Sequence, residues 1–236
     1  MLDDVCLREN YHLLETAIDK NHLRLLLSLR PDQRVSRAIQ MLKGNISREY
    51  GLIHASHRSG QLWAKGYFAQ SSGKVNVEAA RKYVESQASH HGYKGDWSKG
   101  LKFRNEGFVS PAFNISHSLA ILNYHIVLVT DKRIPIFDEA IAPGVFEYLM
   151  KIGAKYQFVV DRMSLLPDHL HLLIQAIPNV SVEACVLGIM NNTQQWMTKR
   201  YLGVLKETGG WNVWQPSFYA GTVGDHTTAQ VKRFLG

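Results

Sequence analysis

The chain has 236 residues, 45% hydrophobic and 20% charged, the composition of an ordinary globular protein with enough sequence for a sizeable core. Its formal net charge of +7 favours a polyanionic partner, with nucleic acid as the first candidate. Only two cysteines are present, far apart in sequence, which argues against a disulfide framework or a zinc ribbon. Because the chain has neither a long apolar run nor a signal-peptide pattern at its start, we expect a cytoplasmic protein without a membrane segment.

The first half of the chain predicts a hairpin, a helix, an aromatic strand and a second helix, in that order. Hydrophobic periodicity and turn residues place these elements at residues 11–29, 35–50, 62–70 and 76–88. The second helix carries Tyr83 and Gln87, which would face the same way because they lie four residues apart.

The second half predicts the same kinds of element with clearer periodicity. It follows a stretch rich in glycine, serine, histidine and lysine, residues 88–118, which we interpret as a connector. We expect strands over 124–130, 156–163, 168–176 and 213–223, and helices over 138–155, over about 181–201 and from about His226 onward.

Two histidines in the strand predicted over 168–176 are separated by one residue. In a strand His169 and His171 would therefore lie on one face, while Leu170 and Leu172 enter the core. Two imidazoles held in this way can serve as a pair of metal ligands. The simpler interpretation is a half-exposed strand with two surface histidines, and the preceding Asp168 is more readily a turn residue than a ligand.

The two halves of the chain repeat each other. At an offset of 147 residues His22 aligns with His169, in strands of similar apolar content. At an offset of 151 residues Trp63 aligns with Trp214, and the next twenty positions align without a gap. Identities are few, but the matching order of elements favours an internal duplication.

The two copies differ at the positions best suited to chemistry. Arg24 of the first copy aligns with His171, and Phe234 of the second copy aligns with Tyr83. A phenylalanine ring has no oxygen, so Phe234 cannot act as a nucleophile. The ten residues before Tyr11 are too few for the strand and helix that precede the matching position of the second copy. Gly107 to Ser110 could fold back as the missing strand.

Three ordered motifs of this chain resemble the IS200/IS605-type single-tyrosine transposases, which are HUH nucleases. The motifs are Asn123 to Phe137, Pro167 to Leu173, and Trp214 to Phe234. The resemblance implies an α+β fold of two ferredoxin- or RRM-like units, each an antiparallel sheet covered by helices, joined as a pseudo-dimer.

On this basis we expect three segments. They are a partial unit over residues 1–88, a connector over 89–118 and a complete unit over 119–236.

The resemblance also implies one composite active site. In that family a histidine pair binds a divalent ion, a tyrosine on a late helix attacks DNA, and a glutamine four residues after the tyrosine commonly completes the metal site. Here these groups would be Tyr83 as the nucleophile and His169, His171 and Gln87 as ligands of Mg²⁺ or Mn²⁺. The mirror site would be inactive; its residues are His22, Arg24 and Phe234.

The implied activity is metal-assisted cutting and joining of single-stranded DNA with hairpin ends, through a 5′-phosphotyrosine intermediate. We expect a monomer that acts as a pseudo-dimer. The basic residues that could contact phosphates, although a solvated basic face explains them almost as well, are Arg48, Lys65, Arg81, Lys82, Lys199, Arg200, Lys232 and Arg233. Two alternatives remain: a catalytically lapsed protein that binds DNA hairpins, and a transposase whose own tyrosine was replaced by Phe234 on purpose.

Overall fold

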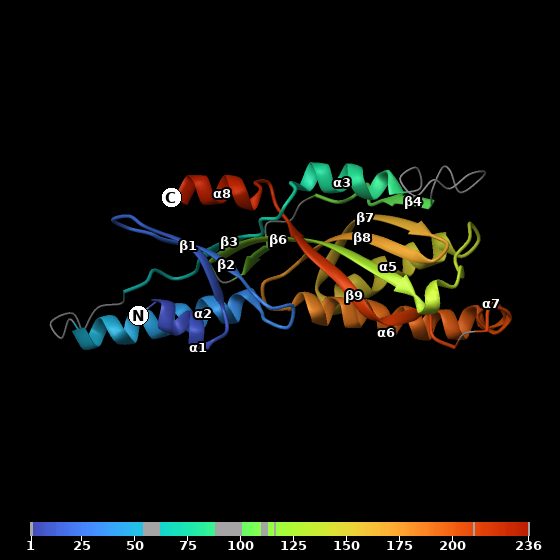
Figure 1. The fold of residues 1–236 in the computed structure, drawn as a ribbon, viewed down its shortest axis with the longest axis horizontal. Coiled ribbons are helices and arrows are strands. Elements are labelled where there is room, and N and C mark those ends of the chain that lie inside the picture. The colour runs from blue at the N-terminus through green and yellow to red at the C-terminus, as the bar shows by residue number, and fades with distance from the viewer. Residues whose placement is uncertain are drawn as a thin grey trace.

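The computed structural model describes residues 2–53, 62–87, 101–109, 113–115, 117–209 and 211–235, with residues 113–115 described by their backbone alone. The fold is α+β, as the sequence predicted, and its strands form a middle layer between two layers of helices (Figure 1). The helices α3 (Val77–Glu85) and α8 (Thr228–Leu235) lie on one side of this layer, and α2 (Val35–Ile53) and α6 (Val182–Arg200) lie on the other. No helix in the described part of the chain is long and apolar enough to cross a membrane.

The second half of the chain forms a complete unit around a central strand, β8. This strand pairs antiparallel with β6 on one side and β7 on the other, while β9 extends the sheet beyond β6 and β4 extends it beyond β7. The strands are β4 (Leu101–Arg104), β6 (Ser118–Thr130), β7 (Phe158–Leu166), β8 (His169–Ala176) and β9 (Trp214–Val223). The helices of this unit besides α6 are α5 (Ala142–Tyr156) and α7 (Leu202–Glu207).

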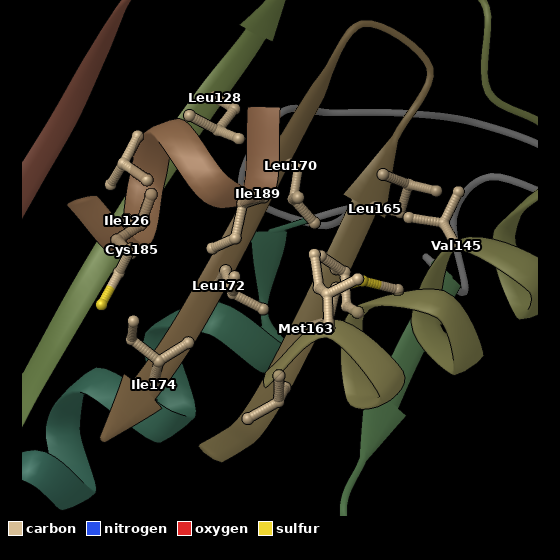
Figure 2. Packing of buried hydrophobic residues seen from close by; sticks show 14 of the residues in the cluster. Ile126, Leu128, Val145, Met163, Leu165, Leu170, Leu172, Ile174, Cys185 and Ile189 are labelled. Atoms are coloured by element: carbon tan, nitrogen blue, oxygen red, sulfur yellow. The ribbon is translucent and has the colours of Figure 1, made fainter. Parts of the chain in front are cut away.

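One face of this sheet forms the main hydrophobic core against α5 and α6 (Figure 2). Leu170, Leu172 and Ile174 of β8 point to this face, as their alternation predicted, and each is at most 1% exposed. They share the core with Val145 of α5 and Ile189 of α6. Burial of side chains of this size contributes about 1.5–3 kcal/mol each, so this face holds the second unit together.

The first half forms a smaller unit on a two-stranded hairpin of β1 (His12–Ile18) and β2 (Leu23–Ser28). The helices α1 (Leu2–Arg8) and α2 pack beside it around a separate small core, in which Val5 and Leu42 are buried. This unit has no sheet of its own beyond the hairpin among the described residues, because its next strand, β3 (Phe68–Gln70), instead pairs in parallel with the beginning of β6.

The structure shows the duplication that the sequence predicted. The helices α2 and α6 both have 19 residues, and their first residues are 147 positions apart. The strands β1 and β7 both shift register at the same relative place, after Leu13 and after Val160. Asn10 lies two residues before β1 and Gln157 immediately before β7. Both residues have a positive φ, 56° and 60°. At this offset α1 corresponds to the last two turns of α5.

The segment interpreted as a connector contributes to the sheet, which the sequence analysis did not predict. β4 adds an edge to β7, and β5 (Phe113–Ile115) pairs with the beginning of β6. Leu101 and Phe103 alternate with the more exposed residues of β4, and Phe103 stacks on Phe146 of α5 with ring centroids 5.0 Å apart. The suggestion that residues 107–110 supply the missing strand is wrong for 107–109, which form the end of a turn and irregular chain after β4; residue 110 is outside the described residues.

The last helices of the two units cross over, so that each helix covers the hairpin of the other unit (Figure 1). The backbone N–H of Val77 donates to the carbonyl of Gly224 (3.0 Å), and that of Thr228 donates to the carbonyl of Gly73 (2.8 Å). These two bonds are related by the offset of 151 residues. A Cβ on Gly73 would overlap the carbonyl of Thr222, so the crossing requires a residue without a side chain.

Candidate active site

Helix α3 is fixed onto the sheet of the second unit by apolar and ionic contacts. Its first turn is capped by Asn76, whose side chain accepts a hydrogen bond from the backbone N–H of Ala79. Ala80 of α3 packs on Leu173 of β8 and on Val223 of β9.

Three ion pairs add to these contacts. The Nε of Arg81 lies 2.8 Å from a carboxylate oxygen of Asp161 in β7. Glu85, near the end of α3, pairs with Arg104 of β4 at 2.7 Å and with Arg162 of β7. The helix is therefore held by four strands, β4, β7, β8 and β9, and it covers the sheet face opposite the main core.

That face carries the histidine pair. His169 and His171 are each 4% exposed, so the half-exposed strand of surface histidines is not what the structure shows. The physical reason is the crossover, because α3 from the first unit covers a face that would otherwise meet solvent. Sequence patterns within β8 alone could not predict this cover.

Tyr83 lies over the histidines. The centroid of its ring is 5.8 Å from that of His171 and 5.6 Å from that of His125, with the rings nearly perpendicular in both pairs. Tyr83 remains 42% exposed, so a substrate can approach its ring from solvent. The structure therefore brings the predicted nucleophile of the first unit beside a predicted metal ligand of the second.

Gln87 lies beyond the end of α3 and not on the same helical turn as Tyr83, because α3 ends at Glu85 and Ser86 caps it. Its side-chain amide donates to the carbonyl of Tyr83 at 2.7 Å, and the residue is fully buried. The amide oxygen, Oε1, has no hydrogen-bond partner among the described residues. A buried amide oxygen without a partner is costly, which is consistent with an oxygen reserved for a ligand.

A third histidine, His125 of β6, belongs to the site and was not among the predicted site residues. It lies opposite Leu173 of β8 and therefore shares the face of His171. The imidazole planes of His125 and His171 differ by only 13°, and the Nε2 of His125 is 3.1 Å from the Nδ1 of His171. The alternation Tyr124-His125-Ile126 in a predicted strand was a signal for it, since Tyr124 and Ile126 had to be the core residues.

Burial lowers the pKa of His125 to about 4, so this imidazole is neutral at neutral pH. The Nε2 of a neutral His125 can accept a hydrogen bond from the protonated Nδ1 of His171. In that tautomer His171 presents the lone pair of its own Nε2, the form that a metal ligand needs.

Asp168 performs the corresponding role for His169. It lies in the turn before β8, as predicted, and a carboxylate oxygen is 2.6 Å from the Nδ1 of His169. Although burial acts to raise the pKa of Asp168, the hydrogen bond with His169 and the nearby guanidinium of Arg133 lower it overall. Contacts to Nδ1 of this kind orient the other ring nitrogen of a metal-ligating histidine.

The donor groups present fit a divalent cation of the Mg²⁺ or Mn²⁺ type. His169 and His171 both have Nδ1 engaged, and Gln87 has a buried amide oxygen without a hydrogen-bond partner among the described residues. No set of three or more His, Cys, Asp or Glu side chains in the described part of the chain is arranged to hold a metal ion. Any cation would therefore need oxygen atoms from substrate or water to complete its coordination.

The mirror site lies where α8 covers the hairpin of β1 and β2. Arg24 of β2 lies under Phe234, 5.9 Å from the ring centroid, and pairs with Asp19 at 3.0 Å. His22 is exposed and also contacts Asp19, 3.2 Å away. The pair of Arg24 and Phe234 thus occupies the place of His171 and Tyr83, without a nucleophilic oxygen.

The predicted phosphate-contacting residues have different surroundings. Arg81 is committed to Asp161, Arg48 pairs with Glu49 at 3.0 Å, and Lys232 is 3.9 Å from Glu15. The remaining predicted cations are exposed: Lys65, Lys82, Lys199, Arg200 and Arg233.

These features define a class of protein. The sequence matches the IS200-like transposase family over residues 1–87 and 118–235, and the chain belongs to that family. The family assignment agrees with the resemblance that the three sequence motifs indicated.

Individual relatives can be named. The chain is 28% identical to the transposase TnpA of ISDra2 from Deinococcus radiodurans over 114 residues, which are 48% of this chain and 81% of that protein. A crystal structure of a transposase from D. radiodurans matches with a TM-score of 0.42 at 23% identity, covering 56% of this chain and 94% of that one. A REP-associated tyrosine transposase bound to a REP hairpin matches with a TM-score of 0.31 at 14% identity, covering 49% of this chain and 62% of that one.

Proposed function

We propose that this protein is a metal-dependent transposase that cuts and joins single-stranded DNA at hairpin-flanked ends through a single composite active site. One observation carries the proposal: the ring of Tyr83 from the first unit lies 5.8 Å from that of His171 in the second. The only other place in the described structure where a late helix covers a hairpin has Phe234 instead of a tyrosine.

The proposed cleavage step uses Tyr83 as the nucleophile. Its oxygen forms a bond to the scissile phosphorus as the bond from phosphorus to the 3′ oxygen breaks, and the 3′ oxygen takes up a proton. The products are a 5′-phosphotyrosine and a free 3′-hydroxyl. Attack of another 3′-hydroxyl on the phosphotyrosine reverses the step and joins two strands.

A divalent cation bound at His169, His171 and Gln87 would withdraw charge from the phosphate oxygens and orient the phosphate. The protein's own part is to hold these donors in place. Asp168 and His125 fix the tautomers of the two histidines, and the ion pairs of α3 hold Tyr83 over them. Its place over the buried imidazoles of His125 and His171 would position the Tyr83 ring for attack.

A second candidate function is a protein that binds DNA hairpins without cutting them. The observation that favours it is the mirror site, where Arg24 and Phe234 stand in the places of His171 and Tyr83. Such a protein would bind DNA equally well with and without a chelator.

The experiment is to incubate the protein with labelled single-stranded DNA that carries a hairpin end, in Mg²⁺ or Mn²⁺, and to look for a covalent adduct on a denaturing gel. We expect an adduct with the native protein, none with Tyr83→Phe, and none with EDTA. Tyr148→Phe is the matched control, because Tyr148 lies on α5 against Trp196 and its adduct yield should be native.

An adduct that survives Tyr83→Phe would overturn the composite site. DNA binding that is unchanged by EDTA and never yields an adduct would instead establish the second candidate.

A further inference from the structure

The mirror site has kept the geometry of a binding site while losing its chemistry. Its residues Arg24, Phe234, Lys232 and Arg233, which we name the Arg24–Phe234 surface, lie on β2 and at the end of α8. Phe234 is 77% exposed, although an aromatic ring of this size normally avoids water. Arg24 lies 5.9 Å from the centroid of that ring.

The charge of this surface favours an anion. Helix α8 contains no acidic residue, and Lys232 and Arg233 occupy its last turn. The acidic groups at the surface are Asp19 and Glu15, and Asp19 holds Arg24 in place. A guanidinium has five N–H donors, so its bond to Asp19 leaves others for a phosphate.

We propose that the Arg24–Phe234 surface binds a second segment of single-stranded DNA and holds it without cutting it. A phosphate would lie on Arg24, where the catalytic site has His171, and an unpaired base would stack on Phe234, where it has Tyr83. The proposal rests on the single-stranded DNA substrate proposed above. Joining two strands requires two DNA segments on the protein at once, and the described residues provide only the one proposed cutting site.

The substitutions explain why this surface binds and does not react. The charge of an arginine is permanent and needs no metal ion, so a phosphate can be held at all metal concentrations. Phe234 presents the same ring as a tyrosine for stacking but no oxygen for attack. The surface therefore suits a role in retention of a strand.

The test measures DNA binding apart from chemistry. Protein carrying Tyr83→Phe is titrated in EDTA with fluorescein-labelled oligothymidine, and its affinity and stoichiometry are read from fluorescence anisotropy. Arg24→Gln and Phe234→Ala are then added singly. The matched control is Arg30→Gln, because Arg30 is also an exposed arginine of the first unit in an ion pair, with Asp32 at 2.9 Å.

We expect each of the two variants to weaken binding at this surface by about tenfold. Arg24→Gln should also reduce the slope of log affinity against log salt by about 0.7, the value for one phosphate contact on a single strand. Arg30→Gln should leave both quantities unchanged.

The proposal would be overturned if both variants bound single-stranded DNA as tightly as the parent protein does. It would also be overturned if Phe234→Ala weakened the binding of duplex DNA as much as that of single strands, because only an unpaired base can stack on Phe234. Because the titration needs neither the tyrosine nor a metal ion, this result is independent of whether an adduct forms. A protein that never forms an adduct but loses binding in these variants would refute the catalytic proposal alone.

Discussion

The two places where a late helix covers a hairpin differ in how the helix is held. Helix α3 buries Ala80 and Val84 against the second unit, whereas α8 buries none of its described residues on the first. The second unit offers α3 a wide sheet, because β6 and β9 continue it beyond β8. Among the described residues of the first unit, α8 has only β1 and β2 to lie on. The wider sheet of the second unit also carries the histidines of the proposed site, one of which, His125, comes from β6.

The crossing itself is the part that the two units share most closely, and its disruption should have the largest effect on stability. A Cβ at Gly73 would overlap the carbonyl of Thr222, and one at Gly224 would overlap that of Ser71. Gly73→Ala and Gly224→Ala should therefore each lower the free energy of unfolding by about 3 kcal/mol in urea denaturation. Gly44→Ala is the control, since nothing lies within 4 Å of its added methyl, and it should be neutral or slightly stabilising. A large difference between the two crossing variants would show that the crossing is not symmetric.

The contribution of β6 to the proposed metal site can be tested through His125. His125→Ala removes the partner of His171 Nδ1 and should weaken Mn²⁺ binding, measured by calorimetry, by about 10- to 100-fold. His22→Ala is the control from the mirror site and should leave Mn²⁺ affinity unchanged. Equal affinities for native protein and His125→Ala would remove His125 from the site.

The ion pairs of α3 and α8 should contribute differently to the free energy of unfolding, although by less than the glycines at the crossing. Arg81 and Lys232 are equivalent in the two copies, but Arg81 pairs with the buried Asp161 and Lys232 with the more exposed Glu15. Arg81→Met leaves a buried carboxylate with less compensation and should cost about 2 kcal/mol of unfolding free energy. Lys232→Met should cost less than about 0.5 kcal/mol, because exposed ion pairs contribute little. Similar costs for the two substitutions would mean that α3 and α8 are held alike.

Much of the fold followed from local patterns. The strand alternation of residues 168–176 predicted which side chains enter the core, and the helical spacing of residues 35–50 predicted α2, which extends to Ile53. The duplication was visible because both copies keep their elements at constant offsets. The edge strand β4 was not predicted, because four residues with two apolar side chains resemble many loops.

The site was predictable only in part. Spacing within one strand was enough to pair His169 with His171. Alternation in β6 indicated the face of His125, but its contact with His171 depends on the register of β6 against β8, which no local pattern encodes. The assumption of a continuous helix placed Gln87 on the same turn as Tyr83, whereas the structure ends the helix at Glu85. The burial of the histidines depends on a helix that lies more than 80 positions earlier in the chain.

The exchange of α3 and α8 between the units has a consequence for how activity would depend on protein concentration. A site shared between two separate subunits falls apart on dilution, and its rate then follows the square of the concentration. Here both contributors to the site are parts of one polypeptide, so they stay together however scarce the protein becomes. With the proposed composite site, a single molecule would hold every protein group of the site without a partner chain.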